Sequence, residues 1–212
     1  MRFNSYLLVL GIFLLPFQLP PLFQPWALAG ESPVIIILGD SISAAYNMET
    51  GQSWPSLLQQ RLDENGYAHR VFNSSISGDT TQGGLSRLPR LLDQHHPVLL
   101  IIELGGNDGL RGIAIDVTRA NLSAMIESSQ VAGATVLLAQ MRIPPNYGMA
   151  YIEQFNRNYI LMQEKYGVLL IPFLLENVAL EPGLMQADGI HPNAEAQPVL
   201  LDTVWAVLEP EL

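Results

Sequence analysis

Asp188 and His191 stand three positions apart near the C-terminus, in the segment Asp188-Gly189-Ile190-His191-Pro192. This spacing brings two side chains onto one side of a turn, so the carboxylate can accept a hydrogen bond from one imidazole nitrogen. The other nitrogen is then free to take a proton from a hydroxyl group. A lone histidine is more often structural, but this pair favours a general base, provided that a nucleophile lies at the same edge of the fold.

Ser41 is the candidate nucleophile, in the segment Gly39-Asp40-Ser41-Ile42-Ser43. It follows an aliphatic run by three positions, where a strand would turn into a helix. At such a turn its hydroxyl can face solvent near the free N–H groups of a helix start. The segment is not a G-x-S-x-G elbow, because Ser43 stands at the last glycine position. Taken alone, Ser41 is better explained as a helix cap.

Two further segments can supply hydrogen-bond donors to a negatively charged oxygen. Asn107 follows two glycines, which permit a tight turn that aims its amide into a crevice, where it can donate to an oxyanion. Gly78 lets the backbone approach a substrate closely and present its N–H group. Both segments also have a structural explanation, since Asp108 can close a turn and Thr80 can cap a helix.

These segments follow predicted strands in a chain whose strand and helix patterns alternate. Aliphatic and β-branched runs predict five strands, over residues 34–38, 70–73, 98–104, 135–139 and 168–171. Periodic apolar positions predict five helices, over residues 54–65, 80–95, 116–131, 151–166 and 194–208. The second of these helices should be broken or kinked near Pro89.

Such alternation predicts parallel βαβ units and therefore one three-layer α/β/α domain with a five-stranded parallel sheet and helices on both faces. Ligands in such sheets bind beyond the carboxyl ends of the strands. Ser41, Gly78 and Asn107 all follow strands directly, so the sequence predicts that they meet at this edge.

The first 29 residues have the pattern of a secretory signal peptide. Arg2 is the only charged residue before Glu31, residues 6–17 form an apolar run, and Ala27-Leu28-Ala29 supplies a cleavage site. The apolar run is short for a bilayer span, which needs about 20 residues. We therefore expect cleavage after Ala29, a domain over residues 30–212, no stable membrane span after cleavage, and a periplasmic or secreted protein. An uncleaved anchor is the alternative.

Composition excludes several classes of protein. The chain has 212 residues, 10 basic and 20 acidic side chains, a formal net charge of −10 and no cysteine. Without cysteine there is no disulfide scaffold, thiol nucleophile or thiolate metal site. An acidic surface repels phosphate backbones, so no nucleic-acid partner is expected. The sequence has no H-E-x-x-H motif and no G-x-G-x-x-G after a strand, so neither a metal nor a dinucleotide cofactor is expected.

In their order along the chain, these segments resemble the sequence blocks of the SGNH (GDSL-type) hydrolases: Gly39-Asp40-Ser41-Ile42-Ser43, Gly78, Gly105-Gly106-Asn107-Asp108 and Asp188-Gly189-Ile190-His191. The resemblance extends over nearly the whole chain after the leader and implies the flavodoxin-like fold of that family. It also implies that Ser41 is the nucleophile and that Asp188 and His191 complete a catalytic triad. Ser41, Gly78 and Asn107 would form the oxyanion hole.

The resemblance implies a serine esterase or thioesterase that cleaves acyl esters and thioesters through an acyl-enzyme. Acyl-CoA, lysophospholipids and aryl esters are the expected small-molecule substrates, with no cofactor and a monomeric enzyme. A carbohydrate-deacetylating esterase on the same fold and a non-catalytic binding module are the alternatives. A binding module would tolerate a missing triad member, and none is missing. Apolar loop residues suit an acyl chain better than a sugar, although core packing also explains them: Ile143, Pro144, Tyr147, Met149, Phe173, Leu174 and Leu175.

Overall fold

The computed structural model describes Met1 and residues 32–212. The predicted signal peptide therefore lies outside the described residues, apart from Met1. Among residues 32–212, no helix combines the length and the apolar character that a membrane span requires.

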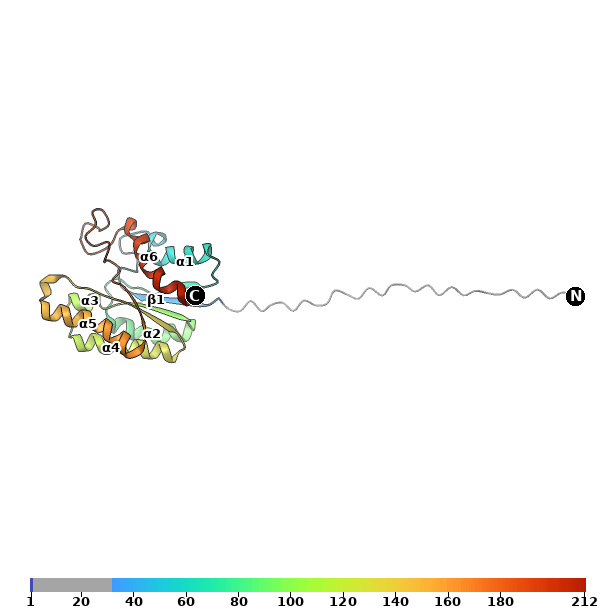
Figure 1. The fold of residues 1–212 in the computed structure, drawn as a ribbon, viewed down its shortest axis with the longest axis horizontal. Helices are drawn as coiled ribbons and strands as arrows, with labels where there is room; N and C mark the ends of the chain where they lie inside the picture. The colour runs from blue at the N-terminus through green and yellow to red at the C-terminus, as the bar shows by residue number, and fades with distance from the viewer. Residues whose placement is uncertain (2–31) are drawn as a thin grey trace. The chain divides into compact units, whose positions relative to one another are not determined.

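A five-stranded parallel sheet forms the centre of this domain, in the order β2-β1-β3-β4-β5 (Figure 1). The strands are β1 Val34–Gly39, β2 Arg70–Asn73, β3 Leu99–Glu103, β4 Thr135–Ala139 and β5 Leu169–Ile171. β1 and β3 are central and almost completely buried, as their aliphatic sequences predict. Their register pairs Gly39 with Glu103, so the segments that follow β1 and β3 leave the sheet side by side.

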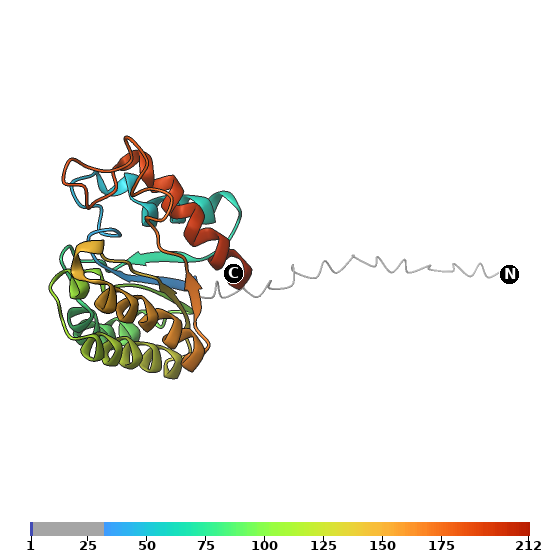
Figure 2. The same cartoon turned by 60° about the vertical axis from the view of Figure 1, so that its left-hand side comes forward.

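Six α-helices cover the sheet: α1 Trp54–Glu64, α2 Thr81–His95, α3 Gly106–Leu110, α4 Ile115–Val131, α5 Met149–Tyr166 and α6 Gln197–Leu208. α1 and α6 pack together on one face, and α2, α4 and α5 pack on the other (Figures 1 and 2). Short 3-10 helices cover Thr50–Gln52, Pro145–Tyr147, Ala194–Ala196 and Glu209–Glu211. The predicted three-layer α/β/α architecture is confirmed.

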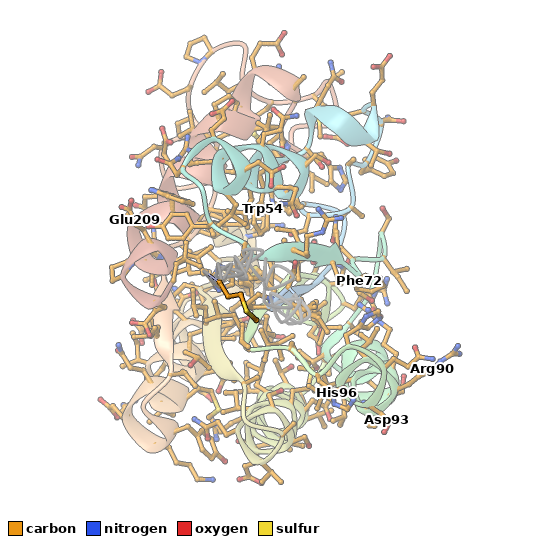
Figure 3. The ribbon with its side chains drawn as sticks, turned by 90° about the vertical axis from the view of Figure 1, so that its right-hand side faces the viewer. Trp54, Phe72, Arg90, Asp93, His96 and Glu209 are labelled. Atoms are coloured by element: carbon orange, nitrogen blue, oxygen red, sulfur yellow. The ribbon has the colours of Figure 1, made fainter. Side chains whose placement is uncertain are left out.

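The core lies on both faces of the sheet, and its largest fully buried side chains are those of Trp54, Tyr159 and Phe155. Trp54 begins α1 and lies between that helix and the sheet, whereas Arg90 and Asp93 lie on the outer side of α2 (Figure 3). Each large apolar side chain buried in this way contributes about 1.5–3 kcal/mol relative to an exposed one. This rigid core holds the strand ends, from which the polar loops emerge.

The predicted break of this helix near Pro89 is wrong, because α2 continues through this residue. Pro89 removes one backbone donor from the helix, but it lies on the exposed side, where water can satisfy the freed carbonyl group. At the start of α2, the Thr80 hydroxyl accepts a hydrogen bond from the N–H of Gly83 and caps the helix. The capping role considered for Thr80 is therefore confirmed.

Candidate active site

Ser41, His191 and Asp188 form a continuous hydrogen-bonded chain at the carboxyl edge of the sheet. The Ser41 Oγ atom lies 2.9 Å from Nε2 of His191, and Nδ1 of His191 lies 2.7 Å from Oδ2 of Asp188. Ser41 comes from the segment after β1, whereas the other two residues come from the long segment between β5 and α6. The structure thus brings Ser41 together with two residues that lie about 150 positions further along the chain.

The backbone around Ser41 differs from the prediction of a helix start. Residues 41–47 form successive turns, and α1 begins only at Trp54. Ala45 and Asn47 have positive φ angles of 57° and 55°, which an α-helix of L-residues cannot accommodate. The N–H of Ala44 donates to the carbonyl of Asp40 at 3.0 Å, so one turn forms and does not propagate. Ser41 therefore sits on a turn, without a helix behind it.

Asp188 is held as a charged acceptor for His191. One of its oxygens accepts the backbone N–H groups of Ile190 and His191, at 2.9 and 3.0 Å, and the other faces the imidazole. These interactions, led by the one with the His191 side chain, lower the pKa of Asp188 to about 2. Asp188 is consequently ionised throughout the neutral range, and it fixes Nδ1 of His191 as the protonated nitrogen.

Tyr46 packs on the imidazole and was missed in the sequence analysis. Its ring centroid lies 4.3 Å from that of His191, with the two planes inclined by 35°. Tyr46 lies in the run of turns after Ser41, so one segment supplies both the Ser41 hydroxyl and an aromatic ring that packs on His191. No periodicity or motif marks this tyrosine, since its contact depends on how the turns fold.

Gly78 and Asn107 lie where the sequence predicts, beyond β2 and β3. Gly78 has a φ angle of +79°, a left-handed conformation that favours glycine, and its carbonyl accepts a 2.8 Å hydrogen bond from the Arg111 side chain. Asn107 lies in the first turn of α3, a short helix where the sequence analysis predicted only a tight turn. Gly105 precedes this helix at a φ angle of 115°, and a Cβ atom there would overlap the Tyr159 hydroxyl.

Asp40 and Glu103 form a buried carboxyl pair beside these residues. Asp40 accepts from the Asn107 amide at 3.0 Å, and its own N–H donates to Glu103 at 3.2 Å. Burial raises the pKa of Asp40 to about 6, and burial together with the Asp40 charge raises the pKa of Glu103 well above its ordinary value. The sequence analysis assigned no site role to either residue, although a carboxylate that ends a buried strand is an unusual pattern.

Asp108 has a structural role. Its carboxylate accepts from the backbone and side chain of Thr81 and from the hydroxyl of Thr118, so it ties α3 to α2 and α4. It is almost completely buried. Within residues 32–212, no group of three or more His, Asp or Glu side chains is arranged to hold a metal ion.

An apolar pocket of about 450 Å³ opens beside Ser41 and His191. Four of the seven loop residues predicted to suit an acyl chain line it: Ile143, Pro144, Phe173 and Leu175. The others do not, since Leu174 is buried in the core and the Tyr147 hydroxyl donates to the carbonyl of Leu110. Apolar lining residues that the sequence analysis missed are Ile42, Leu110, Met141, Ala179, Met185 and Ile190.

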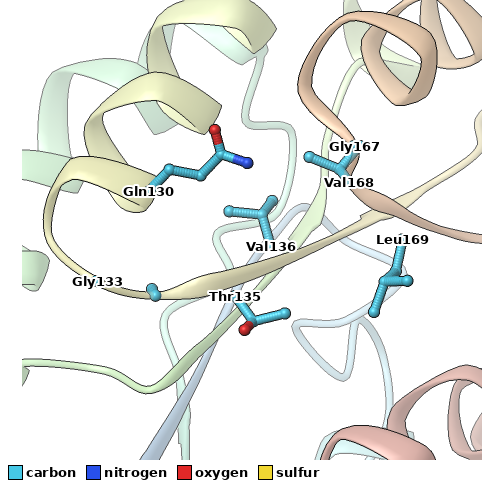
Figure 4. A pocket seen from close by; sticks show the side chains of 8 residues that line it. Gln130, Gly133, Thr135, Val136, Gly167, Val168 and Leu169 are labelled. Atoms are coloured by element: carbon cyan, nitrogen blue, oxygen red, sulfur yellow. The ribbon is translucent and has the colours of Figure 1, made fainter.

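A second hollow, of about 420 Å³, lies at the opposite edge of the sheet (Figure 4). It is lined by residues where β4 and β5 begin, among them Thr135 and Leu169, together with Gln130 from α4. None of its lining residues has an ionisable side chain. The chemistry therefore belongs to the carboxyl edge, as the rule for open parallel sheets predicts.

The chain belongs to the GDSL-like lipase/acylhydrolase family, whose model matches residues 37–198. It is 52% identical over 178 residues to the esterase TesA of Pseudomonas aeruginosa, covering 84% of this chain and 89% of the relative. It is 44% identical over 182 residues to thioesterase 1/protease 1/lysophospholipase L1 of Escherichia coli K12, covering 86% of each chain.

Among solved structures, the esterase EstA of a Pseudoalteromonas species, inhibited by monoethylphosphonate, superposes with a TM-score of 0.81. It is 39% identical, with 84% of this chain and 97% of that chain covered. The predictions of the family, the fold and an enzyme acting on ester and thioester bonds are confirmed. None of these three relatives is named as a carbohydrate deacetylase.

Proposed function

We propose that Ser41, His191 and Asp188 are the catalytic triad of a serine esterase and thioesterase that cleaves acyl chains from small-molecule substrates. The contact that carries this proposal is the 2.9 Å distance between Ser41 Oγ and His191 Nε2, beside an apolar pocket. It is a nucleophile–base pair whose base is oriented by an ionised carboxylate. The Pseudomonas aeruginosa and Escherichia coli relatives are named as an esterase and as a thioesterase and lysophospholipase, which supports the substrate class.

The reaction begins with acylation. His191 takes the Ser41 proton at Nε2 while Oγ attacks the carbonyl carbon of the ester or thioester. The negative oxygen of the tetrahedral intermediate accepts hydrogen bonds from the N–H groups of Ser41 and Gly78 and from the Asn107 amide. Asn107 donates one amide hydrogen to Asp40, which leaves the second for the substrate.

Collapse of the intermediate breaks the bond to the leaving group, and His191 returns the proton to the departing alcohol or thiol. Water then enters, gives a proton to Nε2 and attacks the acyl-enzyme, and the carboxylic acid is released as Ser41 regains its proton. Asp188 stays ionised throughout and stabilises the imidazolium that forms in both halves of the cycle. No step needs a cofactor.

The pocket supports aliphatic acyl groups over acetylated sugars. Its walls are mainly aliphatic, with Phe173 as its one aromatic ring besides His191. A sugar site would need several convergent polar groups that pair with hydroxyls, whereas an acyl chain gains free energy from the apolar area that it buries. Acyl-CoA, lysophospholipids and aryl esters share an acyl group that fits here, with the leaving group directed toward solvent.

We further propose that residues 1–29 are a signal peptide and that the mature hydrolase, residues 30–212, is a periplasmic or secreted monomer. The pattern of one basic residue, a short apolar run and Ala27-Leu28-Ala29 supports this proposal. The intact mass of exported protein should match a chain that begins at Gly30. A full-length mass in the membrane fraction would instead support an anchor.

A chromogenic acyl ester and a serine-directed phosphonate test the triad together. The phosphonate should stop turnover and add its mass to the peptide that contains Ser41, with one adduct per chain. Ser86→Ala is a matched control, since Ser86 is an exposed serine of α2. Labelling of another serine, or turnover that survives labelling of Ser41, would refute the assignment.

A further inference from the structure

The four oxygens of Asp40 and Glu103 are not equivalent. The two Asp40 oxygens accept the N–H of Ile42 at 3.1 Å and the Asn107 amide at 3.0 Å. One Glu103 oxygen, Oε2, accepts both the N–H of Asp40 at 3.2 Å and the Ser43 hydroxyl at 2.7 Å. The fourth, Oε1 of Glu103, is buried and has no donor among the described residues.

This pattern locates a proton. The backbone N–H of Asp40 donates to Glu103 at 3.2 Å, so the two residues are adjacent, and neither carboxyl group forms an ion pair with a basic side chain within residues 32–212. Two buried carboxylates without a cation cannot both carry their charge, so they share one proton. Oε1 of Glu103 is the only one of the four oxygens that accepts no hydrogen bond from a described residue. The shared proton is therefore assigned to this atom.

The groups around Asp40 favour ionisation of Asp40 over ionisation of Glu103. The ionisable groups that face it are Glu103 from β3, Asp79 before α2, Tyr159 from α5 and His191 from the loop before α6. Arg87 neutralises Asp79 through an ion pair of 2.9 Å. The charge of His191, when present, favours an ionised Asp40, whereas Glu103 is farther into the fold and fully buried.

We propose that Asp40 and Glu103 are a positioning pair for the oxyanion hole, in which Glu103 keeps the shared proton and the ionised Asp40 holds the NH2 group of Asn107 toward the reacting carbonyl. An Asn side chain can present either its NH2 group or its carbonyl oxygen at one place. A carboxylate accepts and cannot donate, so it selects the NH2 group. This inference rests on the oxyanion role proposed for Asn107.

Asp40→Asn is the discriminating substitution. Both Asp40 oxygens accept N–H groups, so an amide of the same shape must turn its own NH2 group toward either Ile42 or Asn107. One hydrogen bond is lost in either orientation. An amide, unlike a carboxylate, can also present an NH2 group to Asn107, so the Asn107 side chain is no longer restricted to one orientation. We expect kcat to fall by about tenfold or more, with KM changed less than about threefold.

A double-mutant cycle with Asn107→Ala shows whether Asp40 acts through Asn107. If it does, Asp40→Asn lowers kcat by less than about threefold when Asn107 is already Ala. Asp116→Asn is the control for the loss of one carboxylate, because Asp116 is an exposed residue of α4. Melting temperatures of all variants, measured on the same preparations, separate lost turnover from lost fold.

The cycle also separates this inference from the proposed function. If Asn107→Ala keeps kcat within tenfold of the wild type, Asn107 is not an oxyanion donor, and both its proposed role and the positioning role of Asp40 and Glu103 are wrong, whereas the proposed triad is unaffected. If Asn107→Ala costs about a hundredfold or more and the effect of Asp40→Asn simply adds to it, the positioning role alone is wrong.

A pH profile tests the same point without any change at Asp40, in case that variant does not fold. In the wild type, the proton that Asp40 takes up below about pH 6 releases the Asn107 amide. In Asn107→Ala, the same proton has no amide to release, so the ratio of kcat/KM between the wild type and this variant should fall by about tenfold on the acid side of pH 6. A ratio that stays constant across this range would overturn the inference.

Discussion

The guanidinium group of Arg111 donates to the backbone carbonyl of Gly78 at 2.8 Å and so links the end of α3 to the loop after β2. α3 also carries Asn107, so this short helix bears one of the proposed oxyanion donors and is linked through Arg111 to Gly78, which bears another. Arg111 thereby ties the position of Gly78 to that of α3.

Arg111→Ala should lower kcat by about two- to tenfold, which is the loss expected for one hydrogen bond at an exposed site. Arg111→Lys should restore part of the rate, since an ammonium group can reach the same carbonyl but lacks the planar geometry. Steady-state kinetics on a chromogenic ester measures both. A rise in KM at constant kcat would show that Arg111 contacts the substrate and does not position Gly78.

Ser41→Ala should leave a folded protein that has lost its turnover. The substitution removes one oxygen from a turn, so the free energy of unfolding should fall by no more than about 1–2 kcal/mol. The loss of the nucleophile should lower kcat by about 10⁴-fold or more. Thermal melts and ester hydrolysis should be recorded on one preparation, and turnover within tenfold of the wild type would contradict the nucleophile assignment.

Asn107→Ala should lower kcat by about 100- to 1,000-fold and leave KM nearly unchanged. An amide donor interacts more strongly with the full charge of the tetrahedral intermediate than with the substrate carbonyl, so its loss affects the transition state selectively. Turnover per active site, titrated with the phosphonate, is the measurement to make. A lowered melting temperature with wild-type turnover would identify Asn107 as a residue that only closes the start of α3.

Glu103 should make the fold less stable as the pH rises. Burial raises its pKa above the ordinary value of 4.5, so its stabilising effect is complete below about pH 4.5 and is lost as the pH rises through the pKa of the folded state. Asp40, whose pKa is raised from 3.8 to about 6, acts in the same direction. The melting temperature of the wild type should therefore fall as the pH rises above about 4.5.

Glu103→Gln isolates this effect, because an amide has the same shape and does not titrate. Its melting temperature should fall less steeply than that of the wild type over the same range of pH. Parallel curves for the two proteins would show that Glu103 does not change its protonation between the folded and unfolded states. Hydrolysis by this variant should drop less than about tenfold, since Glu103 is already neutral in the proposed pair.

The sequence predicts the scaffold well because the relevant signals are local. The strands over residues 70–73 and 135–139 occur with their predicted bounds. The aliphatic run over residues 136–138 marks the second of them clearly. The contact between Asp188 and His191 is also local, since a spacing of three suffices to bring a carboxylate to an imidazole.

The features that the sequence analysis missed depend on contacts between distant segments. Asp40 and Glu103 meet only because β1 and β3 pair in a register that aligns Gly39 with Glu103. Tyr46 contacts His191 because the chain turns after Ser41, where Ala45 and Asn47 have left-handed backbone conformations. α3 is too short to show a helical period, so its sequence is typical of a turn. Each of these features follows from tertiary structure.

The 150 positions between Ser41 and His191 also set the time at which the enzyme can become active. The serine follows the first strand, and its proposed base follows the last one, so no partly synthesised chain that ends before His191 contains both groups. Such a chain therefore cannot cleave acyl esters through the proposed triad, however well its early strands have folded. Hydrolysis consequently requires that the whole α/β/α domain has folded. The time at which activity appears during refolding therefore measures when the final segment docks.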